Sequence, residues 1–94
     1  METSRELAAE STRQEVREVV GALIGLEPSE MEDDANLVHL GLSSLDVMRI
    51  SSRWRRAGTP VDFDTLVAGP TVGGWALHLE EVRSRAAAAP DGAA

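Results

Sequence analysis

The sequence predicts an all-α protein, a bundle of four helices with a long loop between the first two and a short third helix. Large apolar residues recur every three or four positions in separate stretches, which is the period of an amphipathic helix. The composition agrees, because 43% of the residues are hydrophobic but only two are Trp and one is Phe. Such an aliphatic sequence suits the small core of a helical bundle.

We expect one folded domain over residues 11–85, since a chain of 94 residues supports a single core. Residues 1–10 contain one large apolar side chain, Leu7, and are predicted to form a flexible lead-in. Residues 86–94 are predicted to be a disordered tail. A start at Met1 and this soft end favour a free-standing protein over a piece of a larger protein.

The first helix is predicted over residues 11–25. Ser11 and Gln14 have the spacing of a capping box, and Gly25 is suited to end the helix. Five apolar residues behind the cap fall on one face, which we expect to pack into the core. They are Val16, Val19, Val20, Leu23 and Ile24.

A long loop is predicted over residues 26–42. Its five clustered acids match no calcium-loop spacing, so a solvated loop is favoured over a metal site. These acids are Glu27, Glu30, Glu32, Asp33 and Asp34. Its apolar residues are expected to hold the loop against the bundle. They are Leu37, Val38, Leu40 and Leu42.

The second helix is predicted from Ser44 to Ala57. Ser43 and Asp46 have the spacing of a capping box, with aspartate in place of the usual glutamate or glutamine. If Ser43 is the cap, Ser44 takes the first helical position and its hydroxyl is free. Gly41 just upstream permits a tight turn and leaves room for the backbone of another protein.

The second helix also carries a core stripe, formed by Val47, Ile50 and Trp54. Leu45 and Met48 lie off this stripe, and the sequence leaves open whether they are exposed contacts or core. Four arginines cover the other faces, at positions 49, 53, 55 and 56. A DNA recognition helix is disfavoured, because the chain is acidic overall and Trp54 lies on the apolar stripe. We expect a solvated face that also contacts a partner.

Asp62 is predicted to open a helix of little more than one turn, with Phe63, Leu66 and Val67 on one face. Thr71 is predicted to cap a last helix that runs to about Arg85. Its core stripe consists of Val72, Trp75, Ala76, Leu79 and Val82. Two consecutive glycines, at positions 73 and 74, weaken the first turn of this helix by about 1 kcal/mol each against Ala if exposed. Close packing against a neighbouring helix is one explanation for them.

Composition excludes several functions. The net charge of −7 argues against non-specific binding to nucleic acid or to an anionic membrane. There is no cysteine, no apolar run of membrane-spanning length and no signal peptide, so we expect a cytoplasmic protein. His39 and His78 lie in no catalytic or metal-binding motif, and each is expected to be a surface or hydrogen-bonded histidine. We therefore expect neither an enzyme nor a metal site.

Three segments resemble the phosphopantetheine carrier proteins, the family of acyl, peptidyl and aryl carriers. Residues 40–45, Leu-Gly-Leu-Ser-Ser-Leu, resemble the attachment motif Leu-Gly-x-Asp-Ser-Leu, departing from it where Ser43 replaces Asp. Residues 44–56 look like helix 2 of peptidyl and aryl carriers, and residues 62–72 look like the passage from helix 3 to helix 4. The likeness covers about residues 14–82. It is greatest to aryl or peptidyl carriers of nonribosomal peptide synthesis, in particular the siderophore type.

This resemblance implies a four-helix bundle of the acyl-carrier type with 4′-phosphopantetheine esterified to Ser44. The arm would hold an aryl, aminoacyl or acyl group as a thioester. The residues around the attachment site would be Gly41, Leu42, Ser43 and Leu45. Partner enzymes would contact a patch made of Leu45, Met48, Arg49, Phe63 and Val67.

The implied partners are a phosphopantetheinyl transferase, an adenylating or acyl-transferring loading enzyme, and condensing or tailoring enzymes of natural-product biosynthesis. We expect the carrier itself to be a monomer. The main alternative is a carrier-like helical interaction domain that is never modified. Such a domain would keep the fold and the apolar patch without needing the Ser44 hydroxyl.

Overall fold

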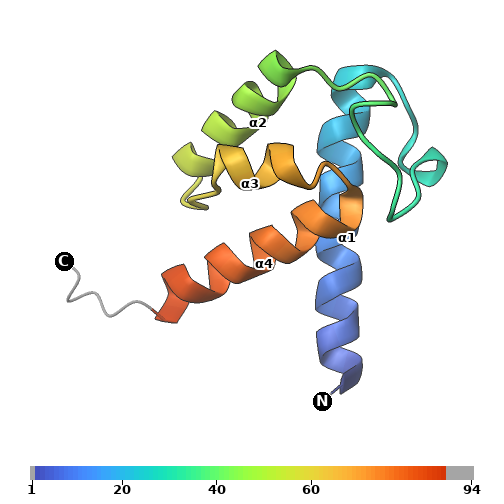
Figure 1. The fold of residues 1–94 in the computed structure, drawn as a ribbon. Coiled ribbons are helices and arrows are strands. Elements are labelled where there is room, and N and C mark those ends of the chain that lie inside the picture. Colours follow the sequence, from blue (N-terminus) through green and yellow to red (C-terminus); the bar gives the residue numbers. More distant parts are fainter. Residues whose placement is uncertain (1, 89–94) are drawn as a thin grey trace.

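The computed structural model describes residues 2–88, with side chains described from residue 7 to residue 87 (Figure 1). As predicted, this part of the chain forms an all-α fold with four α-helices, to which a single 3-10 turn is added. In chain order the elements are α1 (Glu2–Ile24), η1 (Pro28–Glu30), α2 (Ser44–Arg56), α3 (Phe63–Ala68) and α4 (Val72–Ala88). No helix in residues 2–88 is both long and apolar enough to cross a bilayer.

The helices pack in two pairs around one core. The long α1 lies against α4, and α2 lies against the short α3, which also contacts α4 (Figure 1). At the centre, the rings of Trp54 on α2 and Trp75 on α4 meet edge to face, with centroids 6.1 Å apart. Both rings are buried, as the apolar stripes predicted. The other buried apolar residues of the helices are Val16, Val20, Val47, Ile50, Leu66, Val72, Ala76, Leu79 and Val82.

The predicted start of the first helix at Ser11 is wrong, because α1 begins at Glu2. Residues 6–10 are Glu, Leu, Ala, Ala and Glu, all good helix formers, so nothing interrupts the helix before Ser11. Instead of a cap there is an internal bond, in which the Thr12 hydroxyl donates to the Ala8 carbonyl at 2.9 Å. The proposed flexibility of residues 1–10 stays a prediction.

Two apolar residues expected to pack against the bundle lie on the surface, with Leu23 41% exposed and Val38 53% exposed. The loop after α1 folds back over Gly21, where Met31 becomes buried. Leu23 follows Gly21 by two residues, about 200° around the helix, and is therefore on the uncovered side. The apolar stripe in the sequence identifies one face of α1, but the position of the following loop determines which residues of that face are buried.

The α4 helix ends at Ala88, three residues beyond the predicted end, and residues 89–94 of the predicted tail lie outside the described part. Thr71 caps it as predicted, since its hydroxyl accepts the Gly74 N–H at 2.9 Å. Close approach of the backbone, and not of a neighbouring helix, explains Gly74, because a Cβ there would lie 3.0 Å from the Gly69 carbonyl oxygen. The Gly73 N–H donates to the Asp33 carbonyl at 2.8 Å, a bond that does not require glycine.

Candidate functional site

The approach to α2 is held on the bundle by two buried leucines. Leu37 and Leu42 are 0% and 2% exposed, and the Leu37 N–H donates to the Pro70 carbonyl at 2.7 Å. The Leu42 N–H donates back to the Leu37 carbonyl at 3.0 Å, which closes a turn. Gly41 lies within this turn at φ +118°, a conformation that L side chains rarely adopt. A Cβ there would meet no atom within 4 Å, so the space beside the start of α2 is open.

The start of α2 is closed by the capping box that the sequence predicts. The Ser43 hydroxyl accepts the Asp46 N–H at 3.1 Å, and the Asp46 carboxylate accepts the Ser43 N–H at 3.0 Å. The hydrogen bonds from Ser43, with a weaker contribution from the charge of Arg49, lower the pKa of Asp46 below its usual value. Asp46 is therefore ionised at neutral pH and its carboxylate is committed to the cap.

Ser44 is the first residue of α2, and its side chain is exposed. Because Ser43 supplies the cap, the Ser44 hydroxyl is not required for helix stability. The first turn of a helix has unpaired N–H groups and a partial positive charge, which favour a phosphate ester by about 0.3–1 kcal/mol. Of its predicted neighbours, Gly41, Ser43 and Leu45 are exposed, whereas Leu42 is buried beneath the loop.

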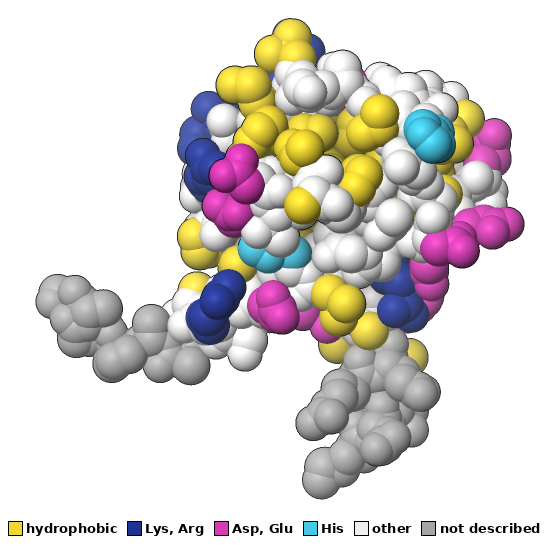
Figure 2. Space-filling model, in the orientation of Figure 1, with side chains coloured by type: hydrophobic (Ala, Val, Ile, Leu, Met, Phe, Trp, Pro, Cys, Tyr) yellow, Lys and Arg dark blue, Asp and Glu magenta, His cyan; other side chains and the backbone are white. Residues whose placement is uncertain are grey.

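An apolar surface lies beside Ser44, over α2 and α3 (Figure 2). Leu45 is 54% exposed, Met48 53% and Val67 44%, while Phe63 is half-buried. The question that the sequence left open for Leu45 and Met48 is therefore decided in favour of exposure. Hollows of about 190 Å³ and about 340 Å³ border Met48, the first reaching Phe63 and the second reaching Leu45 and Arg49. All five residues of the predicted partner patch thus lie on or at the edge of this surface.

Two hydrogen bonds that hold α3 in place were not identified from the sequence. The buried indole N–H of Trp75 donates to the Leu66 carbonyl at 2.9 Å, and the Arg55 side chain donates to the Val61 carbonyl at 3.2 Å. These bonds fix both ends of the segment that carries Phe63 and Val67. Backbone carbonyls are acceptors at every position, so no sequence pattern indicates which one a distant side chain will reach.

The histidines do not join the site. His39 is exposed in the loop, whereas His78 is buried and its Nε2 accepts the Asp62 N–H at 2.9 Å. This is the hydrogen-bonded histidine that the sequence predicted. Asp62 in turn caps α3 by accepting the Thr65 N–H and hydroxyl, and these bonds lower its pKa. Among residues 7–87 no cluster of three His, Asp or Glu side chains is arranged to hold a metal ion.

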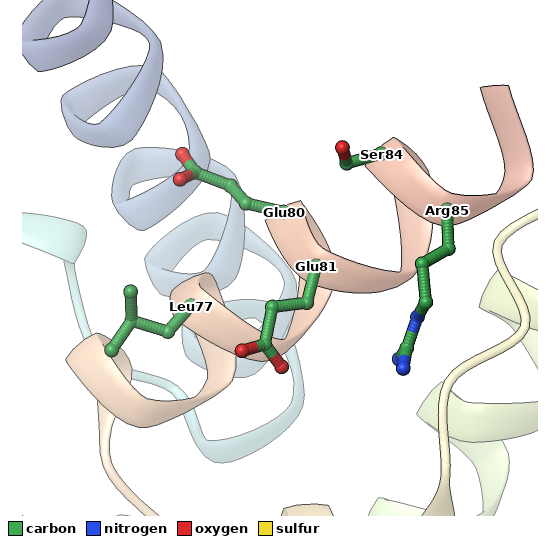
Figure 3. Close-up of a pocket in the computed structure, with 5 residues that line it drawn as sticks. All are labelled: Leu77, Glu80, Glu81, Ser84 and Arg85. Carbon is green, nitrogen blue, oxygen red and sulfur yellow. The ribbon is translucent and has the colours of Figure 1, made fainter. Parts of the chain in front are cut away.

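A larger hollow, of about 590 Å³, lies on α4 (Figure 3). All five residues that line it come from this one helix, and Glu80 extends from it towards α1. They are Leu77, Glu80, Glu81, Ser84 and Arg85. It is a surface depression that includes neither Ser44 nor the apolar patch, so we do not place the functional site there.

Comparison with known proteins gives matches that cover most of the chain. The family model described as phosphopantetheine attachment site matches residues 14–79. Phenyloxazoline synthase MbtB of Mycobacterium sp. (strain MCS) is 39% identical over 74 residues, which are 79% of this chain and 6% of that protein. The MbtB of Mycobacterium tuberculosis (strain ATCC 25618 / H37Rv) is 43% identical over 60 residues, or 64% of this chain and 4% of that protein.

Enterobactin synthase component B of Escherichia coli (strain K12) is 38% identical over 60 residues, which are 64% of this chain and 21% of that protein. The chain therefore spans less than a quarter of the length of each of these relatives. No solved structure gives a significant match.

Proposed function

The chain belongs to the phosphopantetheine attachment site family, whose members carry 4′-phosphopantetheine on a serine, and we propose that in this protein the serine is Ser44. The proposal rests on the different positions of two adjacent serines at the start of α2. Ser43 caps the helix, and the adjacent Ser44 is exposed. It stands at the positive end of a helix beside an open turn.

Attachment is a transfer from coenzyme A. The Ser44 oxygen forms a bond to the phosphorus that carries the pantetheine, the serine proton passes to a base, and adenosine bisphosphate leaves. Among the described residues, the side-chain hydrogen bonds of α2's first turn are those of the Ser43–Asp46 cap, and none joins Ser44 to a base. We infer that a separate phosphopantetheinyl transferase supplies the base and the Mg²⁺.

The attached arm ends in a thiol, which gives a cysteine-free protein a nucleophile. We propose that it holds an aryl, aminoacyl or acyl group as a thioester and passes it between enzymes of nonribosomal peptide or related biosynthesis. The chain itself would catalyse nothing. The similarity to MbtB and to enterobactin synthase component B supports the aryl or peptidyl kind over a fatty-acid carrier.

We further propose that partner enzymes dock on the surface formed by Leu45, Met48, Arg49, Phe63 and Val67. It adjoins Ser44, so an enzyme seated on it would have the arm within reach. The patch is small and the hollows beside it are shallow, which suits a brief contact of the low-area kind. A carrier must release each partner after every transfer.

The test is the intact mass of the protein after incubation with coenzyme A, Mg²⁺ and a promiscuous phosphopantetheinyl transferase. We expect the wild type to gain the mass of one phosphopantetheine and Ser44→Ala to gain none. The Ser43→Ala variant is the matched control, because it removes the neighbouring hydroxyl and should still be modified. No gain on folded wild-type protein would instead support an unmodified interaction domain.

A further inference from the structure

Three of the four arginines of α2 form a stripe on its exposed surface. The helix carries four arginines against one aspartate, in a chain whose net charge is −7. Arg49, Arg53 and Arg56 follow one another at i, i+4 and i+7, so they lie on one face. All three are exposed.

These three arginines differ from those that the fold uses. Arg13, Arg17 and Arg83 make ion pairs with Glu or Asp side chains, among them Arg83–Glu15 at 2.7 Å and Arg13–Glu10 at 2.9 Å. The arginine stripe of α2 has no ion-pair partner among the described residues. Like charges at this spacing repel, so the stripe disfavours the helix unless something outside it compensates.

The stripe borders a hollow with an apolar side. A depression of about 260 Å³ is lined by Leu23 at the end of α1, by Ile50 of the core and by the three arginines. Leu23 is the residue that the fold leaves 41% exposed although it shares a helical face with Val16. The hollow between α1 and α2 therefore combines two apolar side chains with three arginines at its border.

The helix dipole explains the positions of two of the three arginines, but not that of the third or the exposure of Leu23. Arg53 and Arg56 lie in the last turn of α2, where cations are favoured. Arg49 lies near the middle of the helix, beyond the reach of that effect. The helix dipole also does not explain why Leu23, an apolar residue, is exposed.

We propose that the α1–α2 hollow is a second docking surface, and that its occupant is an acidic segment of a partner protein. Carboxylates of that segment would pair with the arginine stripe, while an apolar side chain would cover Leu23. Arg49 and Arg56 also border the hollow that contains Met48, so this surface adjoins the α2–α3 patch. Leu23, Ile50 and Arg53 belong to the α1–α2 hollow and not to that patch.

A protein fits this surface better than a nucleic acid. The sixteen acidic residues of the chain would repel a long polyanion, while a short acidic segment need only meet the local positive charge. Phosphates also gain nothing from an exposed leucine, whereas a side chain such as Leu or Phe would bury it.

The experiment is a titration of the isotopically labelled full chain with a short peptide in which glutamates flank a central leucine. Amide shifts should change at Leu23, Ile50 and Arg53, and the affinity should fall as salt is added. A peptide with glutamines in place of the glutamates is the ligand control. Arg53→Glu should weaken binding by about tenfold, as expected for reversing a charge at the rim of an interface.

Arg85→Glu is the matched protein control, because Arg85 is also an exposed arginine in the last turn of a helix but lies on α4. It makes the same change of net charge and should bind the peptide as the wild type does. The Ser44→Ala variant should also bind normally, so this test succeeds or fails independently of phosphopantetheine attachment. Thermal unfolding of each variant confirms that it is folded.

Three results would overturn the proposal. The peptide could leave all amide shifts unchanged at low salt. It could shift Met48 and Phe63 in place of Leu23, which would assign the acidic segment to the α2–α3 patch. Finally, Arg85→Glu could reduce binding as much as Arg53→Glu does, which would show that net charge alone is responsible.

Discussion

Ser43 and Asp46 hold each other in a reciprocal pair of hydrogen bonds, from side chain to backbone in both directions, at 3.1 and 3.0 Å. The pair satisfies two backbone donors, the N–H groups of Ser43 and Asp46, and leaves the other N–H groups of the first turn free. It also leaves Ser44 exposed at the first helical position. Ser43 therefore caps the helix, and the adjacent Ser44 is left available for the attachment that we propose.

This division predicts opposite outcomes for the two serines. Ser43→Ala should lower the free energy of unfolding by about 1 kcal/mol, the usual effect of losing an N-cap, while Ser44→Ala should leave it nearly unchanged. Urea unfolding followed by circular dichroism measures both. Ser43→Asp should restore the cap and the stability. A large loss of stability in Ser44→Ala would mean that Ser44 and not Ser43 is the cap.

Met48→Glu should slow modification or loading without unfolding the protein, because Met48 is 53% exposed beside Ser44. If partners dock on this patch, docking would bury the new negative charge. The kcat/KM of the partner enzyme for this carrier should then fall by about tenfold, or about 1.4 kcal/mol. The matched control is Leu77→Glu, at an apolar residue that is 66% exposed on α4. Equal rates for the two variants would remove the patch from the docking surface.

Trp54→Ala should lower the free energy of unfolding by about 3–5 kcal/mol, as expected for truncating a large core aromatic. Trp54 is 5% exposed, and its ring and the Trp75 ring meet edge to face. The change therefore opens a cavity and removes an aromatic contact. Denaturant titration measures the loss, and an unchanged midpoint would contradict the assignment of Trp54 to the core.

Gly21→Ala should destabilise the fold even though alanine is the better helix former. A Cβ at Gly21 would lie 2.4 Å from the Leu26 carbonyl oxygen, where the loop folds back over α1. Displacing that backbone should cost about 1–3 kcal/mol. Gly73→Ala is the control, since its Cβ would lie 3.4 Å from the Asp33 carbonyl oxygen, an ordinary contact.

For Gly73→Ala, the free energy of unfolding should be unchanged or should rise by up to about 1 kcal/mol, because alanine has a higher helix propensity than glycine. Thermal unfolding distinguishes the two glycines directly. If both alanine variants were more stable than the wild type, this would contradict the close contact between the loop and Gly21.

Glu15→Gln should lower stability at neutral pH and have little effect in acid. The hydrogen bonds from Arg83, at 2.7 and 2.9 Å, tie α1 to α4 and lower the pKa of Glu15 below its ordinary value of 4.5. A lowered pKa in the folded state stabilises the protein above the unfolded-state pKa, and this contribution is lost as pH falls through the folded-state pKa. The pair is partly exposed, so about 0.5–1 kcal/mol is expected.

The difference in stability between wild type and Glu15→Gln should therefore shrink as pH falls below about 4. Glu81→Gln, at an exposed glutamate of α4, is the matched control and should show no such pH dependence. A constant difference down to acid pH would mean that packing and not charge accounts for the effect of the substitution.

The sequence by itself determined the helical class, the order of the elements and the start of α2. These follow from local rules, since the period of the stripes and the spacing of Ser43 and Asp46 act within a few residues. The burial of Trp54 and Trp75 followed from the same period. The identity of Ser44 as the candidate attachment residue rested on local sequence as well.

Only the tertiary structure decided which parts of each stripe are covered. Leu23 and Met48 are both large apolar residues of a helix, yet whether they are exposed depends on where the loop and α3 lie. The Glu15–Arg83 pair joins residues 68 positions apart, and no local pattern connects them. Burial and ion pairing across a bundle depend on how the helices meet, which is set by all the contacts together and by no single segment.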